Sequence, residues 1–406
     1  MNALISDTVM QAPTSRTRNT IRGRVHLPGE AGFDDTVDQR VVAVVEAAGV
    51  DDIRALLRFA ASAGIPVTTQ PGGRTGGSIL LRTGRLNEIA VDPRTRIARV
   101  GAGVRAGEVQ AAASRHGLTG TPGSSPAVSV TGYLLGGGLG CFAREYGWAA
   151  DHVRAFDVVD ATGRPARVSA DSDPDLFWAL RGGGGDFAIV TAAEYALHPE
   201  PLLFGGRMTW PAERAAEVVD AFRAITADAP DELTVSVDLL PLRRVAVDAT
   251  YLGEEATARD LLHPLDRIGD LISDSRTMTP ITAEPIARAE LLTDLDDVAV
   301  KTLLSAPFRV RIRHLGGALA RHSDTPHGAV SEQYAVHLSG AIRDRQHALI
   351  AALGDKVTGR KPFAFLAPGE SAAQAFSPDT IDRLRRIKRE RDPKGVFRSN
   401  FPVLAR

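Results

Sequence analysis

The residues best suited to chemistry in this sequence are glycines, gathered in loops that could fold the main chain around an anion. The stretch QPGGRTGG, residues 70–77, follows a short apolar run and carries Arg74 in its middle. Further clusters are TPGSSPAVSVTGYLLGGGLG (121–140), which continues into REYGWAADHV, and ALRGGGGDFAIVT (179–191). Glycine permits positive φ and close backbone approach, so N–H groups can converge on a ligand. One cluster alone favours a tight turn, but three favour a large ligand bound by main-chain N–H groups.

A rival interpretation concerns RIARVGAGVRAGEVQAAASRHGL, in which Gly101, Gly103 and Gly107 follow an expected strand and precede a helix expected from about Glu108 to His116. This approximates the glycine fingerprint of a nicotinamide-binding Rossmann unit. The spacing is G-x-G-x-x-x-G, however, and no acidic residue stands about 20 positions further on to hold a ribose. A tight corner between strand and helix fits the segment better.

Composition excludes several classes of protein. Lys+Arg 48 against Asp+Glu 49 gives a net charge of -1, which supplies no long-range field for nucleic acid or an acidic membrane. Cys141 is the single cysteine, so there is no intrachain disulfide framework and no cysteine-built zinc site, and we expect no metal. No window approaches the roughly 20 apolar residues of a membrane span. We therefore expect a cytoplasmic protein that binds neither nucleic acid nor membrane.

The elements that must position these loops suggest two domains, because 406 residues exceed one ordinary core. Residues 1–37 read as a partly ordered arm. A strand, a helix capped by Asp51 or Asp52 and ended by Gly64, and a second strand then open an α/β region. From Met208, amphipathic helices alternate with strand-like runs such as ELTVSVDLL, RRVAVDATYLG, APFRVRIRHLGGALA and QYAVHLSG. We predict an α+β protein whose second domain is an antiparallel sheet with helices on one face.

The segments LLGGGLGCFAREYGWAADHVRAFDVVDATG and DSDPDLFWALRGGGGDFAIVTAAEYALHP resemble the FAD-binding domain of the berberine-bridge-enzyme-like flavoproteins, within the p-cresol methylhydroxylase and vanillyl-alcohol oxidase superfamily. The resemblance covers roughly residues 38–203, resumes at RIRHLGGALA and closes with LRRIKRERDPKGVFRSN. It implies a PCMH-type FAD-binding domain of two subdomains over residues 38–203, a substrate domain over 204–375 whose sheet covers the isoalloxazine, and a return of residues 376–406 to the first domain.

The resemblance also assigns residues to the cofactor. The pyrophosphate loop would be Pro71, Gly72, Gly73, Arg74, Thr75, Gly76 and Gly77. Beside the flavin ring and ribityl chain would lie Pro122, Gly123, Ser124, Ser125, Val128, Val130, Thr131, Gly132, Gly136, Gly137, Gly138, Gly140, Tyr146 and Gly147. The rest of the cradle would be Gly185, with Ile189 and Val190 near the adenine half, and Asn400 as the last contact.

The sequence departs from this family where many members bond the flavin covalently. Arg74 stands in the slot of the histidine that bonds the 8α-methyl group, and Ser125 in the slot of the cysteine that bonds C6. A protonated guanidinium and a serine hydroxyl cannot form these bonds, and Cys141, beyond the GGGLG corner, is expected in the core. We therefore predict non-covalent FAD with a lower reduction potential. Arg74 could contact a phosphate or point to solvent, and the sequence leaves both open.

The catalytic residues are less certain, because KPFAFLAPGE replaces the Tyr-x-Asn motif of many relatives. In SEQYAVHLSG, strand alternation puts Gln333 and His337 on one face, and the resemblance assigns Gln333 to a position that faces the substrate. His337 is a candidate for acid–base chemistry or a buried structural histidine. His314 is a candidate substrate contact. Arg309, Arg311 and Arg313 alternate along one face, as a solvated edge or as a site for an acidic or carbonyl group.

These observations predict an FAD-dependent oxidoreductase that acts on a small organic molecule, in specialised metabolism, with dioxygen as a plausible electron acceptor. Two alternatives stay open. The absent Tyr-x-Asn motif allows a flavoprotein that catalyses a non-redox cyclisation or isomerisation. A binding module of the same fold without cofactor is the other alternative.

Overall fold

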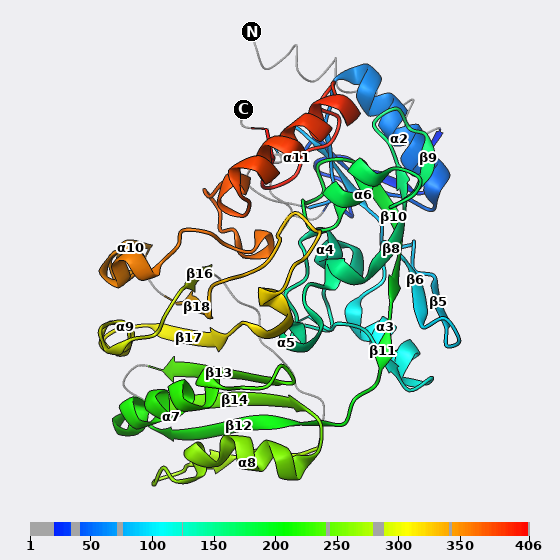
Figure 1. The fold of residues 1–406 in the computed structure, drawn as a ribbon. Helices are drawn as coiled ribbons and strands as arrows, with labels where there is room; N and C mark the ends of the chain where they lie inside the picture. Colours follow the sequence, from blue (N-terminus) through cyan, green and yellow to red (C-terminus); the bar gives the residue numbers. More distant parts are fainter. Residues whose placement is uncertain are drawn as a thin grey trace.

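The computed structural model describes residues 20–33, 41–70, 76–123, 125–240, 244–278, 288–340 and 343–404. Three larger sheets and one two-stranded sheet organise these residues, and a long helix near the C-terminus, α11, returns to the part of the molecule that contains α2 (Figure 1). Two sheets build the part that contains the glycine loops. The third sheet builds the second part. The mixture of helices and sheets, with one antiparallel sheet in a separate part, confirms the predicted α+β class.

The first sheet is small and mixed, with strand order β1-β2-β4-β3. Its strands are β1 (Arg24–His26), β2 (Ala43–Glu46), β4 (Ile79–Arg82) and β3 (Val67–Thr68), and helix α2 (Val50–Ala63) packs on them. The expected N-terminal arm over residues 1–37 is wrong in one respect, because β1 pairs with β2 and Ile21 lies in the core. The described part of that segment belongs to the fold.

Helix α2 ends as expected and begins differently. Gly64 takes the left-handed conformation at the C-cap, with φ 66°. The N-cap is Gly49, so the prediction that Asp51 or Asp52 caps the helix is wrong. The buried carboxylate of Asp52 instead accepts the backbone N–H of Ala48 at 2.7 Å, and those of residues 22 and 23 at 2.8 Å. It therefore fixes the segment before β1 onto the helix.

The second sheet is antiparallel throughout, with strand order β5-β6-β10-β8-β9. Its strands are β5 (Ile89–Asp92), β6 (Ile97–Gly101), β10 (Ile189–Ala196), β8 (Val153–Val159) and β9 (Pro165–Ser169). The associated elements are α3 (Ala106–Ser114), α4 (Val130–Leu135), α5 (Ala143–Tyr146), α6 (Pro174–Leu180) and the pair β7 (Leu118–Thr119) and β11 (His198–Pro199). A single core runs through this sheet, α3, α4, α6 and α11.

Helix α3 lies two residues earlier than the expected span from Glu108 to His116. The corner before it is a tight one, as expected. A Cβ atom on Gly101 would stand 2.2 Å from the Leu86 carbonyl oxygen, and one on Gly103 would stand 2.5 Å from the Thr83 carbonyl oxygen. Both glycines are therefore required by packing within the chain, which favours the structural explanation over a nucleotide fingerprint.

The third sheet has seven antiparallel strands in the order β15-β12-β14-β13-β17-β18-β16. They are β15 (Ser273–Asp274), β12 (Leu203–Pro211), β14 (Arg244–Leu252), β13 (Leu233–Leu240), β17 (Arg309–His314), β18 (Tyr334–Ser339) and β16 (Arg288–Leu292). The helices are α7 (Ala215–Ala227), α8 (Glu255–Asp266), α9 (Asp297–Leu304) and α10 (Arg343–Leu353). They share one apolar core with one face of the sheet, so the other face is turned away from the helices.

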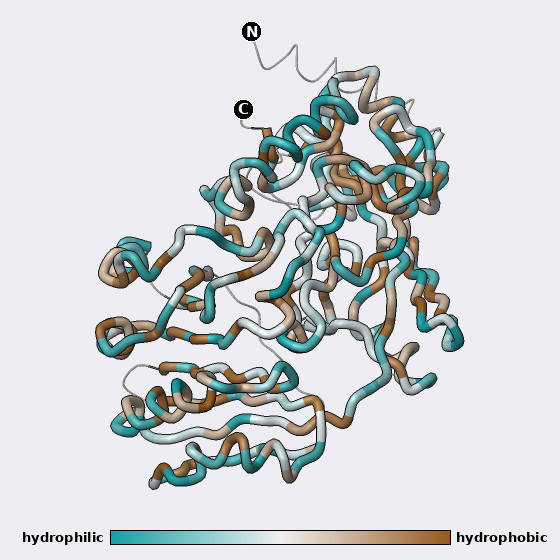
Figure 2. The backbone as a smooth tube through the Cα atoms, in the orientation of Figure 1, coloured by the Kyte–Doolittle hydropathy of each residue, from teal (hydrophilic) through white to brown (hydrophobic). Residues whose placement is uncertain are grey.

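Helix α11 (Pro378–Arg391) is hydrophilic along most of its length (Figure 2), yet it buries Ile381, Leu384 and Ile387 in the core of the second sheet. Short 3-10 helices complete the described residues: η1 (Ala149–His152), η2 (Ala212–Arg214), η3 (Gly317–Ala320), η4 (Gly354–Lys356), η5 (Phe363–Phe365) and η6 (Ala372–Gln374). In the described part of the chain, no helix is both long and apolar enough to cross a membrane.

A buried lysine ties the returning helix to the glycine-rich stretch at 182–185. Lys388 Nζ donates to the Asp186 carbonyl oxygen at 2.6 Å, to the carboxylate of Asp392 at 2.8 Å and to the Phe397 carbonyl oxygen at 3.0 Å. The Asp186 carboxylate accepts the N–H of Ser399 at 3.1 Å and of Val403 at 2.8 Å. Every one of these groups is buried, so the C-terminal segment and the loop form one rigid unit.

Candidate functional site

The described end of the pyrophosphate loop carries the features of an anion site, although residues 71–75, which include Arg74, lie outside the described residues. Gly77 has φ 74°, and no atom of the described residues lies within 4 Å of its Cβ position, so a ligand could approach its backbone from that side. The hydroxyl of Ser78, which follows it, is buried and has no hydrogen-bond partner among the described residues. Arg398 Nη1 donates to the Gly76 carbonyl oxygen at 2.5 Å, so the C-terminal segment helps to position the loop.

The C-terminal segment adds a second buried hydroxyl here. Ser399 is 7% exposed, and its Oγ atom has no partner within the described part of the chain. The main chain beside it is fixed, because Arg398 N donates to the Val67 carbonyl oxygen at 2.9 Å and Ser399 N donates to Asp186. Asn400, the expected last cofactor contact, follows directly. Orphaned hydroxyls near a glycine loop are what a bound phosphate would satisfy.

The four consecutive glycines differ in what requires them. A Cβ atom at Gly182 would stand 2.8 Å from the His327 ring, one at Gly183 would stand 2.4 Å from the Ala179 carbonyl oxygen, and one at Gly184 would stand 2.7 Å from the Phe363 ring. At Gly185 a Cβ atom would meet no atom of the described chain within 4 Å. Protein packing therefore explains the first three glycines, and Gly185 is the one whose surroundings leave room for a ligand. Ile189 and Val190 are buried at the start of β10.

The stretch 121–140 folds back on itself, so that residues 122–123 lie beside residues 140–141. Cys141 N donates to the Pro122 carbonyl oxygen at 3.1 Å, and a Cβ atom at Gly140 would stand 2.2 Å from that same oxygen. Gly137 and Gly138 both have positive φ and pack on His327 and Ala149. We call residues 122–123 and 136–141 the glycine corner. Ser124 lies outside the described residues.

Other residues expected around the flavin occupy varied environments. Val128 is exposed, whereas Val130 and Thr131 are buried at the start of α4, and the Thr131 hydroxyl has no partner among the described residues. A Cβ atom at Gly132 or Gly136 would make ordinary van der Waals contacts, with the nearest atoms at 3.9 Å and 3.5 Å. The ring of Tyr146 stacks on His198 with centroids 4.0 Å apart, and Gly147 follows with φ 75°.

The third sheet docks on the glycine corner with the face that the helices leave free. Thr234 Oγ1 on β13 donates to the Cys141 carbonyl oxygen at 3.1 Å, and the Arg313 guanidinium on β17 donates to the Gly140 carbonyl oxygen. A small apolar cluster that includes Leu139, Trp148 and Ala335 closes the junction beside these bonds. The corner is therefore held between the two parts of the protein.

Three side chains at this junction have buried polar atoms without a partner in the described part of the chain. They are the Tyr133 hydroxyl on α4, Nε of Arg313 on β17, and both ring nitrogens of His337 on β18. Arg313 and His337 are 9% and 2% exposed, and the ring of Tyr133 contacts the Cβ positions of Gly123 and Gly138. Buried polar groups are nearly always satisfied, so three orphans at one junction indicate a ligand that completes them.

Burial also sets the charge of these groups. Desolvation, with the neighbouring guanidinium groups of Arg313 and Arg311, lowers the pKa of His337 to about 3, against a small opposing effect of Asp238. Desolvation raises the pKa of the Tyr133 hydroxyl far above its usual range. At physiological pH the site therefore holds a neutral imidazole and a protonated phenol. Desolvation lowers the pKa of Arg313 as well, but a guanidinium starts from so high a value that it keeps its charge.

The expected catalytic residues do not meet at one place. His337 lies at the junction, where its ring makes an edge contact with Phe365 at 5.1 Å between centroids. Gln333 precedes β18, its side chain is exposed, and its carbonyl oxygen accepts the N–H of Leu315 at 2.7 Å. His314 points to the helix-covered face, where it lies against Tyr334 and Arg144. His314 pairs with Tyr334 across β17 and β18, and His337 lies three residues after Tyr334 on β18. Because side chains alternate between the two faces of a sheet, His314 and His337 lie on opposite faces.

Two residues that the sequence did not single out hold the site together. The guanidinium of Arg144 on α5 donates to the carbonyl oxygens of Leu233 at 2.7 Å, of residues 229 and 230 at 3.0 Å, and of Leu315, and thereby joins the two parts. His327 lies under the glycine corner, stacks on Trp148 at 4.3 Å between centroids and contacts the Gly136 carbonyl oxygen at 3.2 Å. Neither residue stands in a recognisable motif, so only spatial neighbours reveal them.

Comparison with known proteins agrees with this geometry. Residues 41–169 match the family model described as "FAD binding domain". The chain is 27% identical over 454 aligned positions to (R)-6-hydroxynicotine oxidase of Paenarthrobacter nicotinovorans, which covers 95% of this chain and 97% of that protein. The chain is therefore an FAD-dependent oxidoreductase with a PCMH-type FAD-binding domain, and the predicted cofactor and resemblance are confirmed.

Solved structures show the same fold over most of the chain. The BBE-like 1 protein of Physcomitrella patens superposes with a TM-score of 0.84 at 16% identity, covering 97% of this chain and 99% of that one. The 6-hydroxy-D-nicotine oxidase of Arthrobacter nicotinovorans superposes with a TM-score of 0.80 at 23% identity, covering 94% and 98% of the two chains. The buried hydroxyls and the open Gly77 and Gly185 positions fit an FAD held along this path.

Proposed function

We propose that this protein oxidises a small organic molecule of specialised metabolism with FAD that is held without a covalent bond, and that dioxygen is its electron acceptor. The observation that carries the proposal is the group of orphaned side chains where the third sheet meets the glycine corner: Tyr133, Arg313 and His337. They combine a donor, a cation and a neutral imidazole beside the expected flavin-binding loops. Such a site can orient a polar substrate in surroundings that exclude water.

In this proposal the chain's own residues position the reactants. Bound FAD supplies the hydride acceptor for a substrate C–H bond. The neutral ring of His337 can accept a hydrogen bond from a substrate hydroxyl or amine, because its low pKa leaves it unprotonated. The Tyr133 hydroxyl donates a hydrogen bond, since its raised pKa keeps it protonated. The exposed Gln333 side chain and the distant His314 are not assigned to this step.

The proposed absence of a covalent bond rests on residue chemistry. Arg74 lies outside the described residues, and its guanidinium stays protonated at ordinary pH. Ser125 is described, and its hydroxyl accepts the N–H of Ala127 at 3.3 Å. Cys141 is partly buried and its Sγ lies 3.9 Å from the Gly123 carbonyl oxygen. We expect acid precipitation of the purified yellow protein to release FAD into the supernatant, and colour retained in the washed pellet would contradict this.

Two measurements test the oxidation itself. Anaerobic mixing with candidate substrates, beginning with 6-hydroxynicotine and xylobiose because relatives are named for such compounds, should bleach the oxidised flavin, and air should restore it with formation of peroxide. His337→Gln should slow bleaching by the substrate found, by about 10²-fold, while FAD binding stays unchanged. Substrate conversion without any bleaching would instead support the non-redox alternative, and a protein that cannot take up FAD would refute both.

A further inference from the structure

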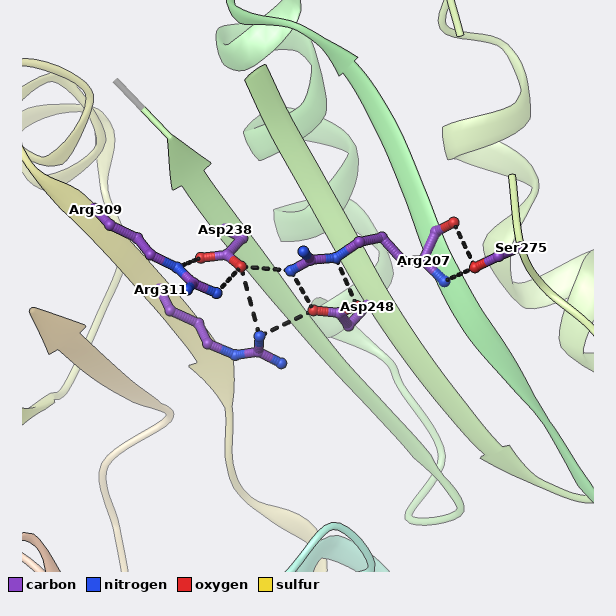
Figure 3. A network of polar contacts seen from close by, with 6 residues as sticks. All are labelled: Arg207, Asp238, Asp248, Ser275, Arg309 and Arg311. Carbon is purple, nitrogen blue, oxygen red and sulfur yellow. Dashed lines mark hydrogen bonds and ion pairs between the residues drawn. The ribbon is translucent and has the colours of Figure 1, made fainter. Parts of the chain in front are cut away.

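The free face of the third sheet carries an arrangement of charge that oxidation alone does not require. Four guanidinium groups lie on it, those of Arg207 on β12 and of Arg309, Arg311 and Arg313 on β17, against the carboxylates of Asp238 and Asp248 (Figure 3). Alternation along the strands places all of them opposite the helix-covered face. These four guanidinium groups and two carboxylates therefore leave an excess of two positive charges within the cluster.

Two of the arginines are fully engaged by carboxylates. Arg309 donates to both oxygens of the buried Asp238, with Nε at 2.8 Å and Nη2 at 2.5 Å. Arg207 donates to both oxygens of Asp248, with Nε at 3.0 Å and Nη2 at 2.9 Å, and also contacts Asp238. These paired contacts use the planar fork of the guanidinium and largely neutralise the outer part of the face.

The next two arginines are progressively less neutralised toward the glycine corner. Arg311 reaches Asp248 at 2.9 Å and Asp238 at 3.6 Å, in both cases through Nη1 (Figure 3), and its other nitrogens make no further ion pair or hydrogen bond among the described residues. Arg313, two residues further along β17, has no carboxylate partner among the described residues. It donates to the Gly140 carbonyl oxygen and leaves Nε buried and unpartnered. A buried guanidinium without a counter-charge is costly, so an anion is expected to complete it.

His337 lies beside Arg311 and Arg313, on the neighbouring strand β18. It pairs directly with Arg311 in the register of β17 and β18, and Arg313 pairs with Ala335, two residues before it. The two unpartnered nitrogens of the ring and the unpartnered Nε of Arg313 thus lie on adjacent strands of one face. Arg311 is 20% exposed, so an incoming molecule can reach this part of the face.

We infer that Arg311 and Arg313 form a subsite for a carboxylate of the substrate, beside His337, so that the oxidised molecule is a small organic acid. This inference rests on the proposed oxidation at the same site. A carboxylate has two oxygens, which can accept the free Nε–H and Nη–H donors of the two arginines. It also neutralises part of the excess charge, which the carboxylates of Asp238 and Asp248 leave uncompensated. A neutral substrate would leave the buried charge of Arg313 unpaired.

Binding of non-reacting acids to the resting holoprotein tests the subsite independently of turnover. Benzoate, phenylacetate and acetate, each compared with its amide, should perturb the flavin absorbance, and calorimetry should give a dissociation constant for the acids. We expect at least one acid to bind at least tenfold more tightly than its amide. Arg311→Gln should weaken that acid about tenfold or more, and Arg311→Lys less, because Lys keeps the charge and loses the fork.

A matched control is Arg223→Gln on α7, which removes the same charge from an exposed pair with Asp297 at 2.8 Å. It should leave acid binding within about twofold, since a surface pair contributes little. Acids and amides that bind equally, or acid binding unchanged in Arg311→Gln, would overturn the subsite. Equally tight binding of inorganic phosphate would overturn the assignment to a carboxylate.

The variant Arg313→Gln tests whether Arg313 binds a carboxylate of the substrate or a group of the flavin. If Arg313 serves the substrate, this variant should lose acid binding and keep the flavin's sulfite affinity. Changed sulfite affinity with unchanged acid binding would show that Arg313 serves the flavin, and would overturn its place in the subsite. Failure of the proposed oxidation is recognised separately, because acid binding can persist in a protein whose flavin no substrate bleaches.

Discussion

Acid should destabilise the packing around the glycine corner through His327, a buried residue that contacts Gly136 and Gly137. The ring is 7% exposed, stacks on Trp148, and contacts the Gly136 carbonyl oxygen, and a Cβ atom at Gly137 would stand 2.4 Å from it. Burial is the main reason that the pKa of His327 falls from 6.5 to about 4. Between these two values the unfolded chain binds a proton that the folded protein excludes. The resulting loss of folding free energy is therefore nearly absent above about pH 7 and grows as the pH falls toward 4.

The magnitude follows from the two pKa values. At pH 5 the difference in proton binding costs about 2 kcal/mol of the free energy of unfolding, and at pH 7 it costs only about 0.2 kcal/mol. His327→Gln removes the titration but keeps an amide that can donate to Gly136. We expect the variant to be less stable than wild type at pH 7, because stacking on Trp148 is lost. The gap between the two proteins should then shrink by about 2 kcal/mol at pH 5.

Urea unfolding of the holoproteins, followed by tryptophan fluorescence at pH 7, 6 and 5, measures this gap at each pH. Other buried histidines titrate in both proteins and cancel in the comparison. A gap that stays constant within about 0.5 kcal/mol from pH 7 to pH 5 would refute the reasoning, since it would mean that His327 takes up its proton equally in both states.

The remaining predictions concern glycines of the expected FAD site and the buried Lys388 that ties helix α11 to it. Gly137→Ala should destabilise the fold by about 3 kcal/mol or more, because φ is 93° and the Cβ atom collides with the His327 ring. Gly185→Ala should leave stability of the FAD-free protein nearly unchanged and weaken FAD about tenfold in reconstitution titrations, and unchanged affinity would remove Gly185 from the cradle. Lys388→Met should lower the free energy of unfolding by about 3–5 kcal/mol, measured by urea, because Asp392 is left buried and uncompensated; a loss under 1 kcal/mol would contradict this.

The cofactor and the order of the elements could be recognised from the sequence because they depend on local patterns. Strand alternation predicted β13, β14, β17 and β18, and an apolar helical period followed by Gly64 predicted α2. The glycine clusters pointed to a large ligand, because a main chain that approaches a ligand closely must lack side chains at those positions, and the resemblance to a flavoprotein family identified that ligand as FAD. The role of each individual glycine was less accessible, since Gly182 and Gly185 look identical in the sequence and differ only in their neighbours.

The polar site could be predicted only in part. Strand alternation placed His337 on the face opposite Tyr334, as observed. It could not show that Arg309 pairs with a carboxylate whereas Arg313 has no carboxylate partner among the described residues. Asp52 was expected at a helix cap, and instead it accepts three N–H groups, two of them 29 and 30 residues away in the chain. Long-range contacts of this kind have no local signature in one sequence.

By itself, the sequence determined the class of cofactor, the α+β organisation and the lack of the residues that usually bond flavin covalently, because composition, periodicity and motif residues are properties of the chain alone. Only the tertiary structure decided which polar groups are left without partners. Whether Arg313, His337 and Tyr133 are satisfied depends on what strands β17 and β18 and helix α4 bring together, from segments nearly 200 residues apart. Desolvation acts on groups in space, so their charge and reactivity are set by that assembly.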